Sequence, residues 1–242
     1  MDNNKSTQKL LHFFFWCHDE ASAFLARHLF GVKRGILIIA HLALFGLFFP
    51  EMRKDFGEMA ATLLIGILFL SPVSKILHMR LLLQMMSLRR ELGITMAYLA
   101  SVHVIGFLID PQWLTLLTDP YLQGGVWAID PAYLFGISAY LLTLPLLLTS
   151  NALAQRSLGK NWKLLHRIVY AVFIFTILHR MLIRGGVDPG GVFQAIVLAS
   201  AYILAKILAW KNFLPPLQKS IDFFAFRYRE YTVIRKAPET LS

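Results

Sequence analysis

Long apolar runs separated by short polar segments are the main pattern along this chain of 242 residues. A helix needs about 20 apolar residues to cross a bilayer, and several runs approach or reach that length. The pattern predicts six membrane helices, near residues 34–50, 57–78, 91–109, 132–150, 162–183 and 191–210. We therefore expect an all-α membrane protein built as a six-helix transmembrane bundle.

The two ends of the chain have a different character from these runs. Residues 1–33 mix aromatic and basic side chains, such as Phe13, Trp16 and Arg27, as helices on a membrane surface do. Residues 211–242 also combine aromatic and basic side chains. The pattern thus predicts an N-terminal interfacial segment at 1–33, a transmembrane domain at 34–210, and a basic-aromatic cytoplasmic tail at 211–242.

Lysine and arginine are unevenly distributed among the polar segments. They are frequent before the first predicted helix, between the second and third, between the fourth and fifth, and after the sixth. The segment 110–131 contains three aspartates and neither lysine nor arginine. Because positively charged loops stay in the cytoplasm, both termini are predicted to be cytoplasmic. The exception is the first outer loop, which carries Arg53 and Lys54 beside acidic residues.

Composition excludes several classes of protein. The chain is 57% hydrophobic and 16% charged, whereas soluble domains carry about 25% charged residues. The net charge of +10 does not indicate nucleic-acid binding, because the basic residues lie between apolar runs and form no stripe. Cys17 is the only cysteine, which rules out a disulfide or a cysteine-ligated cluster within one chain.

Three histidines in the third and fifth predicted membrane helices are the main candidates for chemistry: His103, His166 and His179. Ionisable side chains at that depth are functional candidates, and neutral imidazole is a good ligand for haem iron. With both helices running outward, His103 and His179 fall at similar depth in the outer half. The helix rise separates His166 from them by about 20 Å. The pair can face each other across one haem, although interhelical hydrogen bonding is an alternative role for each.

Other residues suggest how a cofactor would be held. Small residues on the third helix, including Gly93 and Ala100, let a flat macrocycle or simply another helix approach closely. Basic side chains on the predicted inner face offer partners for haem propionates or a flavin phosphate, although they also fix topology. These basic residues are Arg89, Arg90, Arg156 and Lys160.

Two stretches carry most of these residues. They are SLRRELGITMAYLASVHV, residues 87–104, and TSNALAQRSLGKNWKLLHRIVYAVFIFTILH, residues 149–179. Together they resemble the ferric reductase-like transmembrane family, and within it the haem-binding membrane subunits of bacterial periplasmic methionine sulfoxide reductase systems. The resemblance implies that His103 and His179 hold an outer haem b. It also implies that His166 is a ligand or essential partner on the inner side, with Trp162 among the cofactor-binding residues.

One departure from the family affects the expected number of haems. The larger members carry an inner-haem histidine where this chain has Arg89. Either the chain binds one haem, or it binds a second haem through His166 and another group, for which His41 is the best candidate. The resemblance implies an electron-transfer subunit of an oxidoreductase in the bacterial inner membrane. Its electrons would come from the quinone pool or from reduced flavin, such as FMN supplied by a cytoplasmic flavin reductase, and pass to a periplasmic reductase subunit.

Two competing hypotheses remain at this point. A histidine-dependent transporter or proton pathway would use the imidazoles as relays, and it predicts acidic partners inside the helices. The six apolar cores contain almost no acidic residues. A noncatalytic membrane scaffold would leave the spacing of the histidines unexplained.

Overall fold

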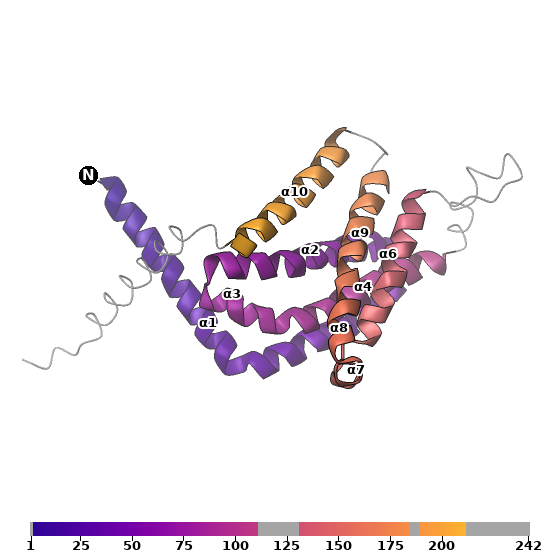
Figure 1. Ribbon diagram of the computed structural model, residues 1–242, viewed down its shortest axis with the longest axis horizontal. Helices are drawn as coiled ribbons and strands as arrows, with labels where there is room; N and C mark the ends of the chain where they lie inside the picture. Colours follow the sequence, from indigo (N-terminus) through magenta and orange to yellow (C-terminus); the bar gives the residue numbers. More distant parts are fainter. Residues whose placement is uncertain (1, 111–130, 184–188, 212–242) are drawn as a thin grey trace, which may run out of the picture. The chain divides into compact units, whose positions relative to one another are not determined.

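A computed structural model describes residues 2–110, 131–183 and 189–211 of the chain (Figure 1). All regular secondary structure in these ranges is helical, so the all-α prediction is confirmed there. The α-helices are α1 (Asp2–Leu42), α2 (Arg53–Leu77), α3 (Arg80–Met85), α4 (Arg89–Leu108), α6 (Pro131–Leu148), α7 (Ala152–Leu158), α8 (Lys160–Leu165), α9 (Val169–Ile183) and α10 (Pro189–Lys211). Short 3₁₀ helices cover Ala43–Phe48, Pro50–Met52, Met86–Leu88 and His166–Ile168.

Five helical segments among the described residues are long and apolar enough to cross a membrane. They are Phe13–Phe48, Pro50–Leu77, Arg80–Leu108, Pro131–Leu148 and Lys160–Ile183. The sixth predicted helix is present as α10, but its apolar stretch, Ile196–Trp210, is shorter than these spans. The described residues therefore give five of the six expected spans.

The first helix covers both the N-terminal segment and the start of the transmembrane domain expected from the sequence. It runs from Asp2 to Leu42 and is kinked at His28, whose backbone is non-helical, with φ −113° and ψ 16°. The position of residues 1–33 at the membrane surface stays a prediction, and residues 212–242 of the tail lie outside the described ranges.

The chain divides into two compact units, each described by itself. The first comprises Met1–Val32, Phe69–Ser87 and Leu204–Ser242. Within it, Ser22 Oγ donates a hydrogen bond of 3.0 Å to Gln84 Oε1. The backbone N–H of Leu81 donates to His18 Nε2 at 3.3 Å. These bonds join α1 to α3.

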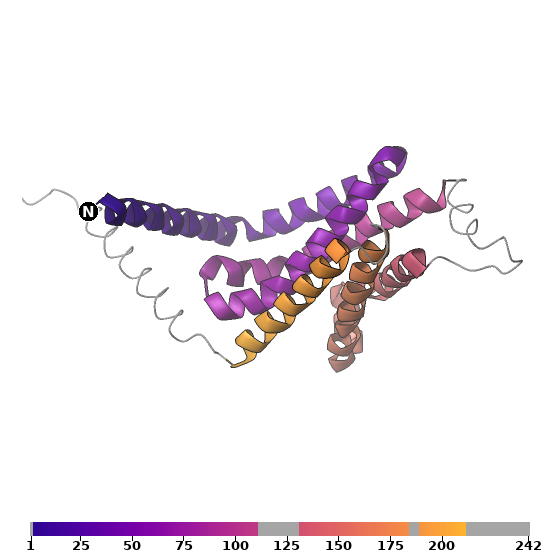
Figure 2. The same ribbon diagram turned by 90° about the horizontal axis from the view of Figure 1, so that it is seen from above.

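The second unit comprises Lys33–Leu68 and Leu88–Ile203. In it, α6 packs along α9 and α4 packs against α6, as Figures 1 and 2 show from two directions. Pro145 lies inside α6, and its carbonyl accepts a hydrogen bond of 3.1 Å from the backbone N–H of Thr149. Thr149 Oγ1 donates to the carbonyl of Pro145 at 2.6 Å. The second unit contains the candidate site.

The predicted helix at 162–183 is interrupted near its start. The side chain of Asn151 caps α7 by accepting from the N–H of Ala154 at 2.8 Å. Gly159 ends α7 with φ +51°, a conformation that favours glycine. A 3₁₀ turn at His166–Ile168 then separates α8 from α9. Because of this turn, His166 and His179 are not related by the regular 100° step of one α-helix.

Candidate functional site

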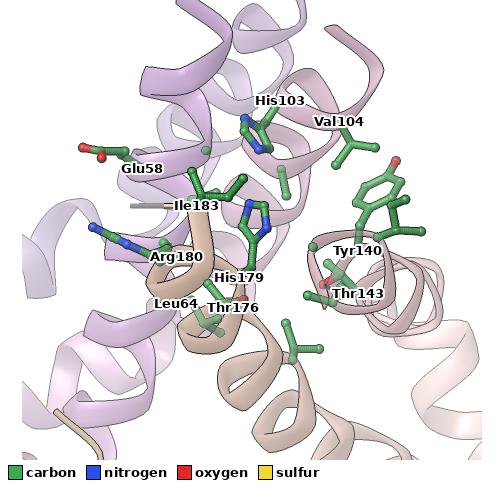
Figure 3. A pocket seen from close by; sticks show the side chains of 18 of the residues that line it. Glu58, Leu64, His103, Val104, Tyr140, Thr143, Thr176, His179, Arg180 and Ile183 are labelled. Carbon is green, nitrogen blue, oxygen red and sulfur yellow. Dashed lines mark hydrogen bonds between the residues drawn. The ribbon is translucent and has the colours of Figure 1, made fainter. Parts of the chain in front are cut away.

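A pocket lies inside the second unit, lined by the start of α2 and by α4, α6 and α9 (Figure 3). Its volume is about 490 Å³, within the range of roughly 300–1,000 Å³ typical of cofactor pockets. The lining is mostly apolar, and many of its side chains are small: Gly57, Ala60, Ala61, Ala100, Gly136 and Ala139. Small residues leave room for a flat ligand close to the helix backbones.

His103 from α4 and His179 from α9 meet in this pocket. Their ring centroids are 6.3 Å apart and the ring planes make an angle of 72°. Figure 3 shows both rings in the middle of the site, with Glu58 and Arg180 on one side of this view and Tyr140 and Thr143 on the other. The depth argument from the sequence thus predicted which two histidines come together. Their role as ligands remains a proposal.

Both imidazoles are oriented by backbone carbonyls of a neighbouring helix. His103 Nδ1 lies 2.8 Å from the carbonyl oxygen of Arg53 at the start of α2. His179 Nδ1 lies 2.7 Å from the carbonyl oxygen of Ala132 at the start of α6. A carbonyl accepts only from a protonated nitrogen, so in the neutral ring Nδ1 carries the hydrogen and Nε2 keeps its lone pair.

The two rings fit the axial ligands of a haem. A metal–nitrogen bond of about 2.0 Å, with about 1.1 Å more to the ring centre, separates the centroids of two trans imidazoles by about 6.2 Å. The observed separation is 6.3 Å. Hydrogen bonding of the other ring nitrogen to a carbonyl is also the usual support for a metal-bound histidine. The residues present therefore suit a bis-histidine haem.

Charged side chains line the same pocket and were not assigned to it from the sequence. Lys54 and Glu58 come from the start of α2, and Arg180 follows the histidine of α9. The sequence held one indication of a role for Lys54, because this residue belongs to the basic pair that departs from the charge pattern expected of outer loops. Arg180 immediately follows His179 in an otherwise apolar helix, which is a second signal of the same kind.

His166 lies in a separate cluster at the junction of α8 and α9. Its ring is stacked on Trp162, with centroids 4.0 Å apart and an interplanar angle of 30°. His166 Nε2 lies 3.2 Å from Thr149 Oγ1. Trp162 Nε1 donates to the carbonyl of Thr149 at 2.9 Å. The structure thus groups three residues of the predicted inner side, away from the pocket lining.

His41 has a different neighbour from the one considered in the sequence. Its Nε2 lies 3.3 Å from the hydroxyl of Tyr98, and its Nδ1 lies 2.6 Å from the carbonyl of Leu37. Tyr98 lies nine residues into α4, whereas His166 lies at the start of its span. A haem shared by His41 and His166 stays a prediction that these contacts do not support.

The four basic residues expected at the inner face lie on three helices. Arg89 and Arg90 begin α4, Arg156 is in α7 and Lys160 begins α8. Arg90 donates to Glu91 Oε1 through Nε at 3.1 Å and through Nη2 at 2.8 Å. Arg89 Nε and the second oxygen of Glu91 are buried with no hydrogen-bond partner in the described part of the chain. Arg156 and Lys160 are exposed.

Comparison with known proteins shows the family of the chain. The family described as "Ferric reductase like transmembrane component" matches residues 56–177, a range that contains His103 and His166. This range is half of the chain. The chain belongs to the ferric reductase-like transmembrane family. It is a multi-pass protein of the bacterial inner membrane.

Several curated members of this family are similar to the chain over most of their length. A protein of Cronobacter sakazakii is 30% identical over 171 residues, which are 68% of this chain and 82% of the relative. One from Pectobacterium atrosepticum is 31% identical, covering 69% and 81%. One from Azospira oryzae is 33% identical, covering 66% and 64%. Each is named "Protein-methionine-sulfoxide reductase heme-binding subunit MsrQ". No solved structure matches the chain.

Proposed function

We propose that this chain is a haem b electron-transfer subunit that serves a periplasmic methionine sulfoxide reductase. The observation that carries the proposal is the pairing of His103 with His179 at 6.3 Å, each with Nδ1 on a backbone carbonyl. The names of the MsrQ relatives support both the haem and the reductase system. A bound haem supplies reversible one-electron chemistry at iron.

The residues of the pocket have distinct roles in this proposal. His103 and His179 would hold the iron through their Nε2 atoms. Lys54 and Arg180 pair with the two propionate carboxylates, since both line the pocket and cations form charge-assisted hydrogen bonds with such groups. The apolar lining excludes water from the rest of the pocket.

Electrons enter from the cytoplasmic side and leave toward the periplasm. The distribution of lysine and arginine supports this direction, because it predicts that His166 and Trp162 lie at the inner end and His103 and His179 at the outer end. The donor is a quinol or a reduced flavin. The buried, unpartnered Nε of Arg89 supports an anionic group, such as a propionate or phosphate, at the inner end.

A histidine-dependent transporter is favoured less by the described contacts. Such a relay passes protons between imidazoles and carboxylates, and Glu58 lines the same pocket as the two histidines. The Nδ1 atoms of His103 and His179 are instead bonded to carbonyls of Arg53 and Ala132. Glu91 is fully buried, but its Oε1 accepts from Arg90 on the same helix.

Reconstitution with a methionine sulfoxide reductase catalytic subunit tests the function. We expect reduction of methionine sulfoxide to depend on this chain and to be lost in His103→Ala. A catalytic subunit that works equally well with the variant would contradict the proposal. Reporter fusions test the direction, because a fusion near Gly159 should read cytoplasmic and one near Gln123 should read periplasmic. The opposite pattern would reverse the flow.

A further inference from the structure

The two histidines of the pocket contact neighbouring helices in the same way. A Cβ added to Gly57 in α2 would lie 2.5 Å from His103 Nδ1 and 2.7 Å from its Cε1. A Cβ added to Gly136 in α6 would lie 2.8 Å from His179 Nδ1 and 2.9 Å from its Cε1. Real Cβ atoms essentially never come that close, so each ring occupies the space that a side chain would need.

The two glycines also occupy equivalent positions relative to the carbonyls that the histidines contact. His103 is bonded to the carbonyl of Arg53, four residues before Gly57, and His179 to the carbonyl of Ala132, four residues before Gly136. In a helix the carbonyl of residue i accepts from the N–H of residue i+4, and the two positions lie on one face. A carbonyl has a second lone pair that an outside donor can use. To reach that lone pair, the outside donor must approach past residue i+4. Only glycine, which has no side chain, leaves room for it there.

We propose that Gly57 and Gly136 are positioning residues that seat the two imidazoles on these carbonyls and turn each Nε2 into the pocket. The inference rests on the proposed function, because it explains how backbone carbonyls orient both iron ligands. The hydrogen bond to Nδ1 makes Nε2 a stronger ligand. The positions of the two carbonyls also set the angle of 72° between the rings.

Two other glycines provide matched controls. Gly66 lies in α2 and Gly35 in α1, and an added Cβ would meet nothing within 4 Å at either position. Alanine is a better helix former than glycine. Gly66→Ala and Gly35→Ala should therefore keep the parental haem content and melt at the parental temperature or above it.

The experiment compares purified Gly57→Ala and Gly136→Ala with these controls by haem-to-protein ratio, absorption and EPR spectra, and midpoint potential. We expect haem affinity to fall about 10- to 100-fold in both variants, as when the hydrogen-bond partner of a ligand is removed. The low-spin signal should weaken, more in Gly57→Ala because its contact is shorter. Free imidazole should restore the low-spin spectrum by replacing the displaced ring, which it could not do for a general packing defect.

A further variant covers the case in which Gly57→Ala fails to fold. The double variant Gly57→Ala/His103→Gly removes the ring that the added methyl group would strike, so it should fold and bind haem with free imidazole. Failure of this double variant while His103→Gly folds would overturn the inference. So would glycine variants that keep the parental spectra and potential. A parent protein that binds no haem would instead overturn the proposed function and the inference with it.

Discussion

Arg53 Nη1 and Asp110 Oδ2 form an ion pair of 2.6 Å that joins the start of α2 to the end of α4. Arg53 also donates to the carbonyl of Gly106 at 3.1 Å, and its guanidinium carbon lies 5.1 Å from the ring centroid of Phe107. Its own carbonyl is the one that orients His103. The basic residue that departs from the expected outer-loop charge pattern therefore has a structural role beside the pocket.

Replacing Arg53 with alanine should lower the stability of the protein. Asp110 would lose a charge-assisted hydrogen bond, which is worth about 1.5–3 kcal/mol. The carbonyl at position 53 remains, so we expect haem to stay bound below the melting temperature. Thermal unfolding in detergent measures the effect, with Arg34→Ala at an exposed position as the control. Equal melting temperatures for the two variants would show that the ion pair contributes nothing.

His103→Ala and His179→Ala should each remove one axial ligand from the same haem. Each variant should therefore lose most of the low-spin signal. The double variant should be little worse than either single variant, because residues that act as a unit are not additive. His28→Ala, in the first unit, is the control and should keep the parental spectrum. Additive, partial losses would mean that the two histidines serve different groups.

Depth and helix length made this pair of histidines predictable from the sequence. The contacts around the two histidines were not predictable, because these contacts depend on how helices far apart in the chain are rotated against each other. Gly57 and Gly136 give no sign in the sequence of which ring each one meets. The kink of α1 at His28 gives no sign in the sequence, because a histidine is compatible with a regular helix. The 3₁₀ turn at His166 follows from tertiary packing that no periodicity reveals.

His166→Ala should separate the inner cluster from the haem pocket. We expect the haem of the pocket to stay bound, since His166 contacts Thr149 and Trp162 and does not line the pocket. Its reduction by a donor from the cytoplasmic side should become slower. Stopped-flow absorption with a quinol or reduced FMN measures this rate, and dithionite, which reduces without a donor site, is the control.

The same variant tests the number of haems. If a second haem binds, His166→Ala should lower the haem-to-protein ratio, and His41→Ala should do the same if it supplies the partner ligand. With one haem, His41→Ala should be nearly silent, because its contacts are with Tyr98 and Leu37. A ratio of two in the parent that neither variant lowers would rule out both residues as inner ligands.

Lys54→Met and Arg180→Met should weaken haem retention without changing the axial ligands. Each removes a cation that we assign to a propionate, and a hydrogen bond to a charged group is worth about 1.5–3 kcal/mol. Partial exposure to water should reduce that value, most of all for Lys54, which is exposed.

The midpoint potential of the haem should also fall in both variants, because a positive charge near the iron favours the reduced state. Haem transfer to an apo-globin and a redox titration measure the two effects, with Lys75→Met as the control. Unchanged retention and potential would remove both residues from the site.

The absorption spectrum of the purified parent protein is the most direct test of the central claim. Produced with haem available and purified in detergent, it should be red, with a Soret band that shifts on dithionite reduction and the sharp visible bands of a bis-histidine haem b. Because the two rings are 72° apart, the oxidised protein should also give the strongly anisotropic low-spin EPR signal of near-perpendicular ligands. A folded, colourless protein would contradict the assignment of His103 and His179 as a haem-binding pair.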